Sequence, residues 1–325
     1  MAKLRQSGIR YFFMNTTFIL TGGAGRTVCS IPALEKYARL NPNDDFKIIT
    51  HGWDVFFWSN PILQQRTFNQ NQKGLFDIII KNSKVNMVEP YHVHEFFNEK
   101  ISLIEAFDVC INNTHDHSDL KDKDYLYLSE YEKKSARQYV KEEKLKKRKK
   151  YVVMTQPYGS GVEMLDGAPH DDTSRSLEHD HYHELLNYLK DDSVVLYASH
   201  DKFKRTGDDS VSFENIHPLL PYLRIMMALI SECDYFIGCD SLGQHIAKAF
   251  GKKGLIIMGA TGDVCFSYPK DFTIYRKAIP KFFPWRLADP DAMFAARLND
   301  NMMNFNQEQK KAINNIIDKE LRHRF

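Results

Sequence analysis

Residues 234–262 read DYFIGCDSLGQHIAKAFGKKGLIIMGATG, and this stretch decides the fold. Residues 235–237 form a short apolar run typical of a strand buried in a parallel sheet, and residues 255–258 form a second one. Between them, residues 246–250 have the apolar spacing of a short helix, which Gly251 is suited to end. The stretch therefore predicts a strand, a helix and a strand of an α/β protein with a parallel sheet.

The turn between the first strand and the helix carries the features of a phosphate site. Gly238, Cys239 and Asp240 lie at the carboxyl end of the strand, and Ser241 is the expected N-cap of the helix. Gly243 allows a ligand to approach the backbone closely. Because free amides at a helix start attract anions, we expect a pyrophosphate to bind here.

The same stretch resembles the pattern D-[ST]-G-x-x-H-x-A-x-A-[LF]-G of glycosyltransferase family 9, the lipopolysaccharide heptosyltransferase family. The matching residues are Asp240, Ser241, Gly243, His245, Ala247, Ala249, Phe250 and Gly251. Leu242-Gly243 stands where that family usually has Gly-Pro or Gly-Leu. Sparse matches in the same order extend over residues 16–262.

The resemblance implies the GT-B fold, in which two Rossmann-like domains with parallel sheets face each other. Residues 1–148 would form an N-terminal acceptor-binding domain and residues 149–305 a C-terminal domain that binds a nucleotide sugar. Residues 306–325 would form a last helix that crosses back to the first domain. The basic run KKRKK at residues 146–150 marks the expected boundary, and we interpret it as a solvated linker.

Composition excludes several other classes of protein. The chain has 325 residues, 44 Lys and Arg against 42 Asp and Glu, and no run of the ~20 apolar residues that a membrane span needs. No strong overall charge selects nucleic acid. The five cysteines are odd in number and widely spaced, which indicates reduced thiols. We therefore expect a soluble cytoplasmic protein, in the host cytoplasm if the chain is viral.

Apolar runs predict further elements on both sides of the boundary. In the first half we expect strands at residues 11–20, 46–50, 75–80, 85–88 and 107–111, and helices at 28–40 and 128–145. The second helix would bury Leu128, Tyr131, Ser135, Tyr139 and Leu145. In the second half we expect strands at 151–155 and 193–198, helices at 177–189, 221–232 and 307–321, and a loop with one short strand over 261–285.

The glycine-rich turn TGGAGRT at residues 21–27 follows the first strand. Gly22, Gly23 and Gly25 do not spell the dinucleotide pattern G-x-G-x-x-G, which disfavours an NAD-dependent enzyme. The turn and the following Pro-Ala-Leu resemble the amino-terminal signature of family 9. The family's acid, thought to act as catalytic base, is replaced here by Arg26.

The resemblance and the turn chemistry together give a set of donor-site residues. The loop QPYGSG at 156–161 suits a phosphate neighbour but lacks the lysine of a P-loop. Arg175 is the nearest equivalent of a family lysine that contacts the donor, and a guanidinium can neutralise a diphosphate. The expected donor-binding residues are Gln156, Ser160, Arg175, Asp240, Ser241, Leu242, Gly243, Gln244 and His245.

Family 9 chemistry is a direct displacement at the anomeric carbon with inversion, which needs a base for the acceptor hydroxyl. Arg26 cannot accept a proton at neutral pH, so another residue on a first-domain loop must serve. We expect Asp54 first, and His51 and His92 after it, because all three follow predicted strands. Gly22, Gly23, Gly25 and Arg26 would then form the acceptor-side loop.

No metal or resident cofactor is expected, with the nucleotide sugar acting as co-substrate. His179 and His183 share a helix face at a spacing of four, and Asp180 and His181 lie between them. Spacing places no third ligand beside them. A solvated helix start accounts for Asp180 through the helix dipole.

Two other functions stay open at this point. A viral-type enzyme that glycosylates hydroxymethylated bases in DNA would share the fold, and both the KKRKK run and the lost acid fit it. A nucleotide-sugar-binding protein without catalysis would also explain Arg26. The acceptor is therefore a glycan, a lipopolysaccharide-like molecule or DNA.

Overall fold

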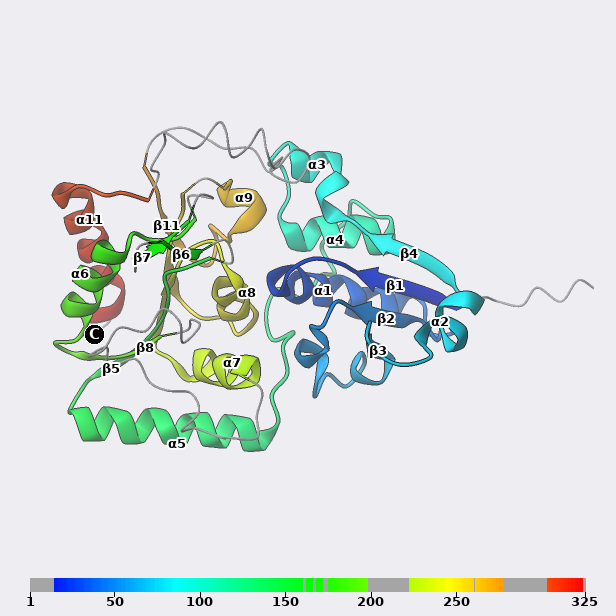
Figure 1. Ribbon diagram of the computed structural model, residues 1–325, viewed down its shortest axis with the longest axis horizontal. Coiled ribbons are helices and arrows are strands. Elements are labelled where there is room, and N and C mark those ends of the chain that lie inside the picture. The colour runs from blue at the N-terminus through cyan, green and yellow to red at the C-terminus, as the bar shows by residue number, and fades with distance from the viewer. Residues whose placement is uncertain are drawn as a thin grey trace, which may run out of the picture.

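The protein was analysed as a computed structural model that describes residues 15–159, 162–165, 168–171, 175–197, 222–259, 261–277 and 303–323. It consists of two α/β halves that lie side by side, each with its own sheet (Figure 1). The chain passes from the first sheet to the second through the long helix α5 (Glu130–Lys147).

The first sheet has four parallel strands in the order β3-β2-β1-β4. The strands are β1 (Thr16–Leu20), β2 (Lys47–Thr50), β3 (Thr67–Asn69) and β4 (Lys84–Val88). Phe18 and Leu20 of β1 point into a core shared with α1 (Ala24–Leu40) and α4 (Leu103–Asn112). The opposite face carries a small cluster around Ile49. Successive side chains of β1 therefore point alternately into the core under α1 and α4 and into the cluster on the opposite face.

The second sheet has five parallel strands in the order β11-β10-β9-β5-β8. The strands are β5 (Tyr151–Gln156), β8 (Ser193–Tyr197), β9 (Tyr235–Gly238), β10 (Gly254–Ile257) and β11 (Thr273–Tyr275). One face packs on α6 (His179–Leu189) and α11 (Gln307–Ile317), and the other on α7 (Tyr222–Glu232) and α8 (Leu242–Ala249). Burial on both faces explains why these strands read as continuous apolar runs.

Shorter elements complete the described chain. The remaining helices are η1 (Asp54–Phe57), η2 (Gln64–Arg66), α2 (Leu75–Ile78), η3 (Ile80–Asn82), η4 (Pro90–His92), α3 (His94–Phe97), α9 (Asp263–Phe266) and a π-helical turn η8 (Asp318–Arg322). A small antiparallel hairpin, β6 (Glu163–Leu165) and β7 (Ala168–His170), follows β5. None of the helices in the described part of the chain combines the length and apolar character that crossing a membrane requires.

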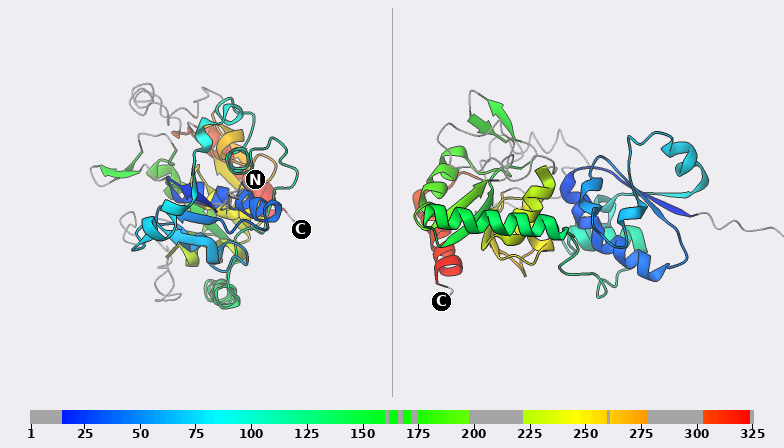
Figure 2. Two further views of the ribbon diagram at one scale, coloured as in Figure 1. Left: turned by 90° about the vertical axis from the view of Figure 1, so that its right-hand side faces the viewer. Right: turned by 90° about the horizontal axis from the view of Figure 1, so that it is seen from below.

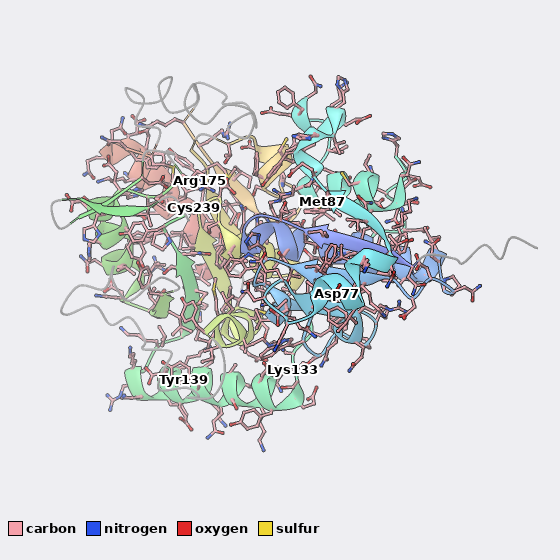
Figure 3. The ribbon with its side chains drawn as sticks, turned by 45° about the vertical axis from the view of Figure 1, so that its right-hand side comes forward. Asp77, Met87, Lys133, Tyr139, Arg175 and Cys239 are labelled. Carbon is pink, nitrogen blue, oxygen red and sulfur yellow. The ribbon has the colours of Figure 1, made fainter. Side chains whose placement is uncertain are left out.

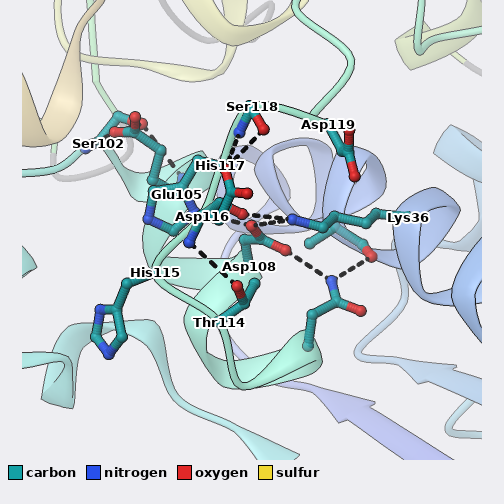
Figure 4. A network of polar contacts seen from close by, with 12 residues as sticks. Lys36, Ser102, Glu105, Asp108, Thr114, His115, Asp116, His117, Ser118 and Asp119 are labelled. Carbon is teal, nitrogen blue, oxygen red and sulfur yellow. Dashed lines mark hydrogen bonds and ion pairs between the residues drawn. The ribbon is translucent and has the colours of Figure 1, made fainter.

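Buried polar groups hold α1 against α4 (Figure 4). Nζ of Lys36 donates to Oδ2 of Asp108 at 3.0 Å, and Asp108 is fully buried. Nδ1 of His117 lies 2.8 Å from the same oxygen, and Asn112 donates to Oδ1 at 2.7 Å. Both oxygens of the buried carboxylate are hydrogen-bonded, so the network holds α1 and α4 together.

Helix α5 joins the two halves and packs along the second (Figure 2). It begins at a capping box in which Ser129 accepts from the amide of Glu132 and Glu132 accepts from the amide of Ser129. The predicted helix is confirmed, and its predicted buried face is right in part. Leu128 is buried and Tyr139 packs half-buried on the core, as predicted, but Tyr131 and Leu145 are exposed. The fully buried helix residues are instead Glu132 and Ala136.

Two strands predicted in the first half are wrong. Residues 75–80 form α2 and the start of η3, and residues 107–111 lie inside α4. Short apolar runs fit a strand and a buried helix equally well, and a capping box of Ser102 and Glu105 starts α4 here. The strand β3 was not predicted because it is short and half polar.

The ends of several predicted elements also differ. Helix α1 begins at Ala24 and not at residue 28, so the glycine turn runs directly into it. Strand β1 begins at Thr16, and residues 11–14 of the predicted strand lie outside the described residues. The segment after β10 holds the predicted short strand, β11, and also the unpredicted helix α9.

The C-terminal helix does not cross back to the first half, as the sequence had led us to expect. Ile313 and Ile317 of α11 are buried in the core of the second half. Asp318 accepts from the hydroxyl of Tyr188 at 2.6 Å, and Nε of Arg322 donates to Asp192 at 2.7 Å. The apolar face of α11 is therefore satisfied by the second sheet and α6.

Candidate functional site

The strand order of the second sheet has its switch point between β5 and β9. Chain order reverses at these two strands, and ligands of open parallel sheets bind beyond the carboxyl ends at such a switch point. Gln156 ends β5, and the turn from Cys239 to Ser241 follows β9. The predicted donor residues from both loops are thus brought together.

Gly243 is needed for packing between these two loops. Its amide donates to Oε1 of Gln156 at 2.5 Å. A Cβ at this position would lie 2.4 Å from Oε1 of Gln156 and 2.8 Å from the ring of Phe236. The sequence predicted that this glycine leaves room for a ligand, whereas in the structure the room is filled by Gln156 and Phe236.

A buried ion pair lies beside the start of α8. Asp240 is 4% exposed and Arg175 is 7% exposed, with Nη1 of Arg175 3.8 Å from Oδ2 of Asp240. Gln244 donates to Oδ1 at 3.3 Å, while Oδ2 accepts no hydrogen bond from any residue in the described ranges. Figure 3 shows Arg175 beside Cys239 in the second half. A buried carboxylate oxygen without a hydrogen-bond donor can accept a hydrogen bond from a ligand hydroxyl.

The other predicted donor residues have mixed roles. Ser241 occupies the N-cap position, but its hydroxyl donates to the carbonyl of Cys239 at 3.4 Å and caps no helix amide. Gln244 is fully buried, donates to the carbonyl of Phe266 at 2.8 Å and accepts from Ser267. Leu242 is half-buried, and Ser160 lies outside the described residues.

His245 packs between the two halves of the chain and away from the ion pair of Arg175 and Asp240. Its Nδ1 lies 2.7 Å from the hydroxyl of Tyr268 and 3.4 Å from Sγ of Cys29 on α1, 216 residues earlier. A Cβ on Gly25 would lie 2.8 Å from Cδ2 of His245. Burial lowers the pKa of His245 to about 4, against a smaller opposite effect of Asp240. His245 is therefore a neutral packing residue.

The carboxyl edge of the first sheet faces the same region. Chain order reverses between β1 and β4, and the loops after these strands meet through Arg26, whose Nη2 donates to Oε1 of Glu89 at 3.1 Å. The guanidinium carbon lies 4.4 Å from the ring centre of Tyr91. Gly22 has φ of +89°, which a residue without Cβ adopts at low cost. Gly23 is the N-cap of α1. Glu89 was not among the predicted site residues.

The three residues predicted as bases lie elsewhere on this edge. Asp54 begins η1, and its Oδ1 accepts a hydrogen bond from Asn69 at the end of β3 at 2.7 Å. His51 is exposed after β2. His92 is exposed in η4, three residues after Glu89. Asp54 and His51 are thus on the β2 side of β1, while His92 is on the β4 side.

The histidine cluster on α6 makes local contacts. Nε2 of His183 lies 3.0 Å from Nε2 of His179, and Nδ1 of His179 lies 2.8 Å from the hydroxyl of Tyr158. Burial lowers the pKa of His181 to about 4. Within the described residues, no group of three or more His, Cys, Asp or Glu side chains is arranged to hold a metal ion.

Comparison with known proteins identifies the fold. No protein-family profile and no curated protein sequence matches the chain. Among solved structures, the ADP-heptose LPS heptosyltransferase II of Escherichia coli is 13% identical with a TM-score of 0.56, covering 87% of this chain and 99% of that one. A glycosyl transferase family 9 protein of Veillonella parvula is 8% identical with a TM-score of 0.63, covering 94% and 98%.

A third similar structure is the iron-containing dodecameric glycosyltransferase TibC of enterotoxigenic Escherichia coli. It is 13% identical with a TM-score of 0.56, over 96% of this chain and 80% of that one. The similarity of all three structures extends over nearly the whole chain. The predicted fold, a GT-B arrangement of two Rossmann-like halves like that of family 9, is confirmed.

Proposed function

We propose that this chain, which has the fold of family 9 glycosyltransferases, transfers a sugar from a nucleotide-diphosphate sugar to an acceptor hydroxyl. One observation carries the proposal. At the switch point of the second sheet, the buried Asp240 presents an oxygen that accepts no hydrogen bond from the described residues, beside the buried cation of Arg175. A sugar hydroxyl complements the first group and a diphosphate complements the second.

The reaction is a direct displacement with inversion at the anomeric carbon. The acceptor oxygen forms the new bond, the bond from the anomeric carbon to the diphosphate breaks, and the electron pair leaves with the nucleotide. Arg175 and the positive end of the α8 helix dipole supply the positive charge that the leaving diphosphate needs. Because these groups belong to the chain, the reaction proceeds without a metal ion.

An ADP-heptose is the donor to test first, since heptosyltransferase II is named for it and a TibC structure holds ADP-D-β-D-heptose. A glycan or lipopolysaccharide-like acceptor fits better than DNA. In the KKRKK run, Lys146 and Lys147 lie 3.7 and 3.5 Å from Glu143, and Lys149 donates to the carbonyls of Lys190 and Asp191. These contacts favour the linker interpretation of the run.

A second candidate function is nucleotide-sugar binding without turnover. The observation that favours it is the ion pair of Arg26 and Glu89, because Arg26 replaces an acid of family 9. The two functions differ in turnover and not in donor binding.

The test is calorimetric binding of ADP-D-β-D-heptose, followed by ADP release with glycan and lipopolysaccharide acceptors. Asp240→Ala should weaken donor binding about tenfold or more, because it removes a buried hydrogen-bond acceptor. Asp191→Ala, at an exposed position before β8, is the matched control and should bind as the parent does. Binding without ADP release would establish the second function. Absence of binding to every nucleotide sugar would remove both.

A further inference from the structure

The switch point of the first sheet lies between β1 and β4, and the loops that follow these strands meet there. The loop after β1 leads into α1, whose third residue is Arg26. The loop after β4 begins with Glu89. By the same topological rule that places the donor crevice in the second sheet, this pair of loops is where the first half binds its ligand.

Arg26 fixes the carboxylate of Glu89 at this switch point. Its Nη2 donates to Oε1 of Glu89 at 3.1 Å and to the carbonyl of Val88 at 3.4 Å, and its side chain is 12% exposed. The amide of Tyr91 also donates to Oε1, at 3.3 Å. Oε2 accepts no hydrogen bond from the described part of the chain, and the Glu89 side chain is 33% exposed. One oxygen is therefore anchored and the other can reach a ligand.

The loops that carry Arg26 and the anchored carboxylate contact the second half of the chain. Gly25, the neighbour of Arg26, lies against His245. Tyr91, which stacks on Arg26, has its ring centre 6.3 Å from that of Phe266 on α9. The fully buried thiol of Cys29, whose pKa burial raises to about 12, feels the opposite charges of Asp240 and Arg26. The start of α1 and the loop after β4 thus both contact the second half, and the charge of Asp240 reaches α1.

We propose that Glu89 is the general base of the reaction and that Arg26 is its positioning residue. This inference rests on the proposed function. A carboxylate oxygen of Glu89 takes the proton of the acceptor hydroxyl while the acceptor oxygen forms its bond to the anomeric carbon. The bond from the anomeric carbon to the diphosphate breaks, and the diphosphate departs with its electron pair. Water then takes the proton from Glu89. The acid that family 9 carries at the position of Arg26 is replaced here by an acid on the loop after the neighbouring strand β4.

The other acidic candidate is less suited to this role. Asp54 follows β2, on the far side of β1 from the switch point, and its Oδ1 is bonded to Asn69. Glu89 lies on the near side and is held by a cation that touches the glycine turn.

The experiment compares single-turnover rates and donor binding, with ADP-D-β-D-heptose as the probe. Glu89→Gln should lower the rate about 100-fold or more and leave donor binding within about threefold, because a base acts only on the acceptor proton. Glu95→Gln is the matched control. Glu95 has the same side-chain exposure, 33%, and also has an ion-pair partner, His115 at 3.4 Å. Its rate should stay within about twofold of the parent.

A swap variant separates catalysis from structure. Arg26→Asp combined with Glu89→Gln returns a carboxylate to the position that family 9 uses and should react about tenfold or more faster than Glu89→Gln alone. If Glu89→Gln unfolds at a lower temperature than the parent, its rate no longer reports on catalysis alone. Glu89→Asp, which keeps the charge on a shorter side chain, is then compared with the parent. It should fold as the parent does and lose about tenfold in rate.

The outcomes separate the two proposals. A parent that binds and turns over the probe while Glu89→Gln keeps more than about a third of its rate overturns the role of Glu89 alone. A swap variant no faster than Glu89→Gln overturns the equivalence of the two positions. A parent that neither binds nor turns over any nucleotide sugar overturns the proposed function and this inference with it.

Discussion

Arg224 donates to both carboxylate oxygens of Glu132 at 2.7 Å, although 92 residues separate them in the chain. Its other donors reach the carbonyls of Val55, Trp58 and Tyr127. Arg224 is fully buried on α7 of the second half, Glu132 is at the start of α5, and Val55 belongs to η1 of the first half. This single side chain therefore ties the linker helix to both halves.

Breaking this pair should be costly. Glu132→Ala leaves the buried guanidinium without its counter-charge, and we expect a loss of about 3–5 kcal/mol in the free energy of unfolding. Arg137→Ala is the control, because its ion pair with Glu232 is exposed on the arginine side and should contribute far less to the free energy of unfolding. Urea unfolding measures both. Equal losses in the two variants would show that Arg224 is hydrated in solution.

The segment at residues 234–262 could be predicted because all of its signals are local. Its strand ends, the helix start at Ser241 and Gly251 with φ of +62° are each set by neighbours in the sequence. The predicted strands at 75–80 and 107–111 failed because a short apolar run does not tell a strand from a helix packed on a sheet. Ser102 and Glu105 are spaced as a capping box and were the available signal for α4.

The position of the proposed base could not be predicted from the sequence in the same way. Glu89 is followed by Pro90 and resembles any loop residue. Its partner Arg26 lies 63 residues earlier, and the two meet only because β1 and β4 are neighbours in the sheet. Strand order depends on how the whole first half packs, which no local pattern contains. The burial of His245 against Cys29 has the same origin, since it needs both halves in place.

Gly243→Ala should destabilise the protein as well as weaken the donor site. The added Cβ would meet Oε1 of Gln156, which can move, and the ring of Phe236, which is fully buried and cannot easily move. Overpacking of this kind costs about 1–3 kcal/mol. Gly52→Ala is a contrasting variant, because only its φ of +88° and no neighbouring atom opposes a Cβ. A midpoint temperature of thermal unfolding that is the same for Gly243→Ala as for the parent would refute this packing role.

Stability should fall in mild acid because His245 is buried in its neutral form. Its pKa is about 4 in the folded protein and about 6.5 in the unfolded chain, so between these values the unfolded state binds more protons. Stability is therefore lost as the pH falls below about 6.5, by on the order of 1–2 kcal/mol between neutral pH and about pH 5. His181 acts in the same direction.

His245→Gln should remove the part of this pH dependence that His245 contributes, and His51→Gln, at an exposed position, should remove none. Urea unfolding at three pH values between neutral and about pH 5 measures the slope in each protein. A His245→Gln slope equal to that of the parent would mean that the imidazole already gains its proton in the folded state.

Arg175 provides the last test, because its predicted partner is the diphosphate and not the sugar. Arg175→Lys keeps a charge but loses the planar fork, and Arg175→Ala loses both and leaves Asp240 buried without its cation. Donor affinity should therefore fall from the parent to Arg175→Lys and again from Arg175→Lys to Arg175→Ala. At least one of these two losses should be about tenfold.

The ratio of AMP to ADP dissociation constants identifies the contact of Arg175, since only a residue that touches the outer phosphate changes this ratio. In Arg175→Ala this ratio should approach one, whereas in Arg137→Ala, with its exposed arginine, it should match the parent. A ratio that is the same in all four proteins would assign Arg175 to holding Asp240 in place and remove it from the diphosphate site.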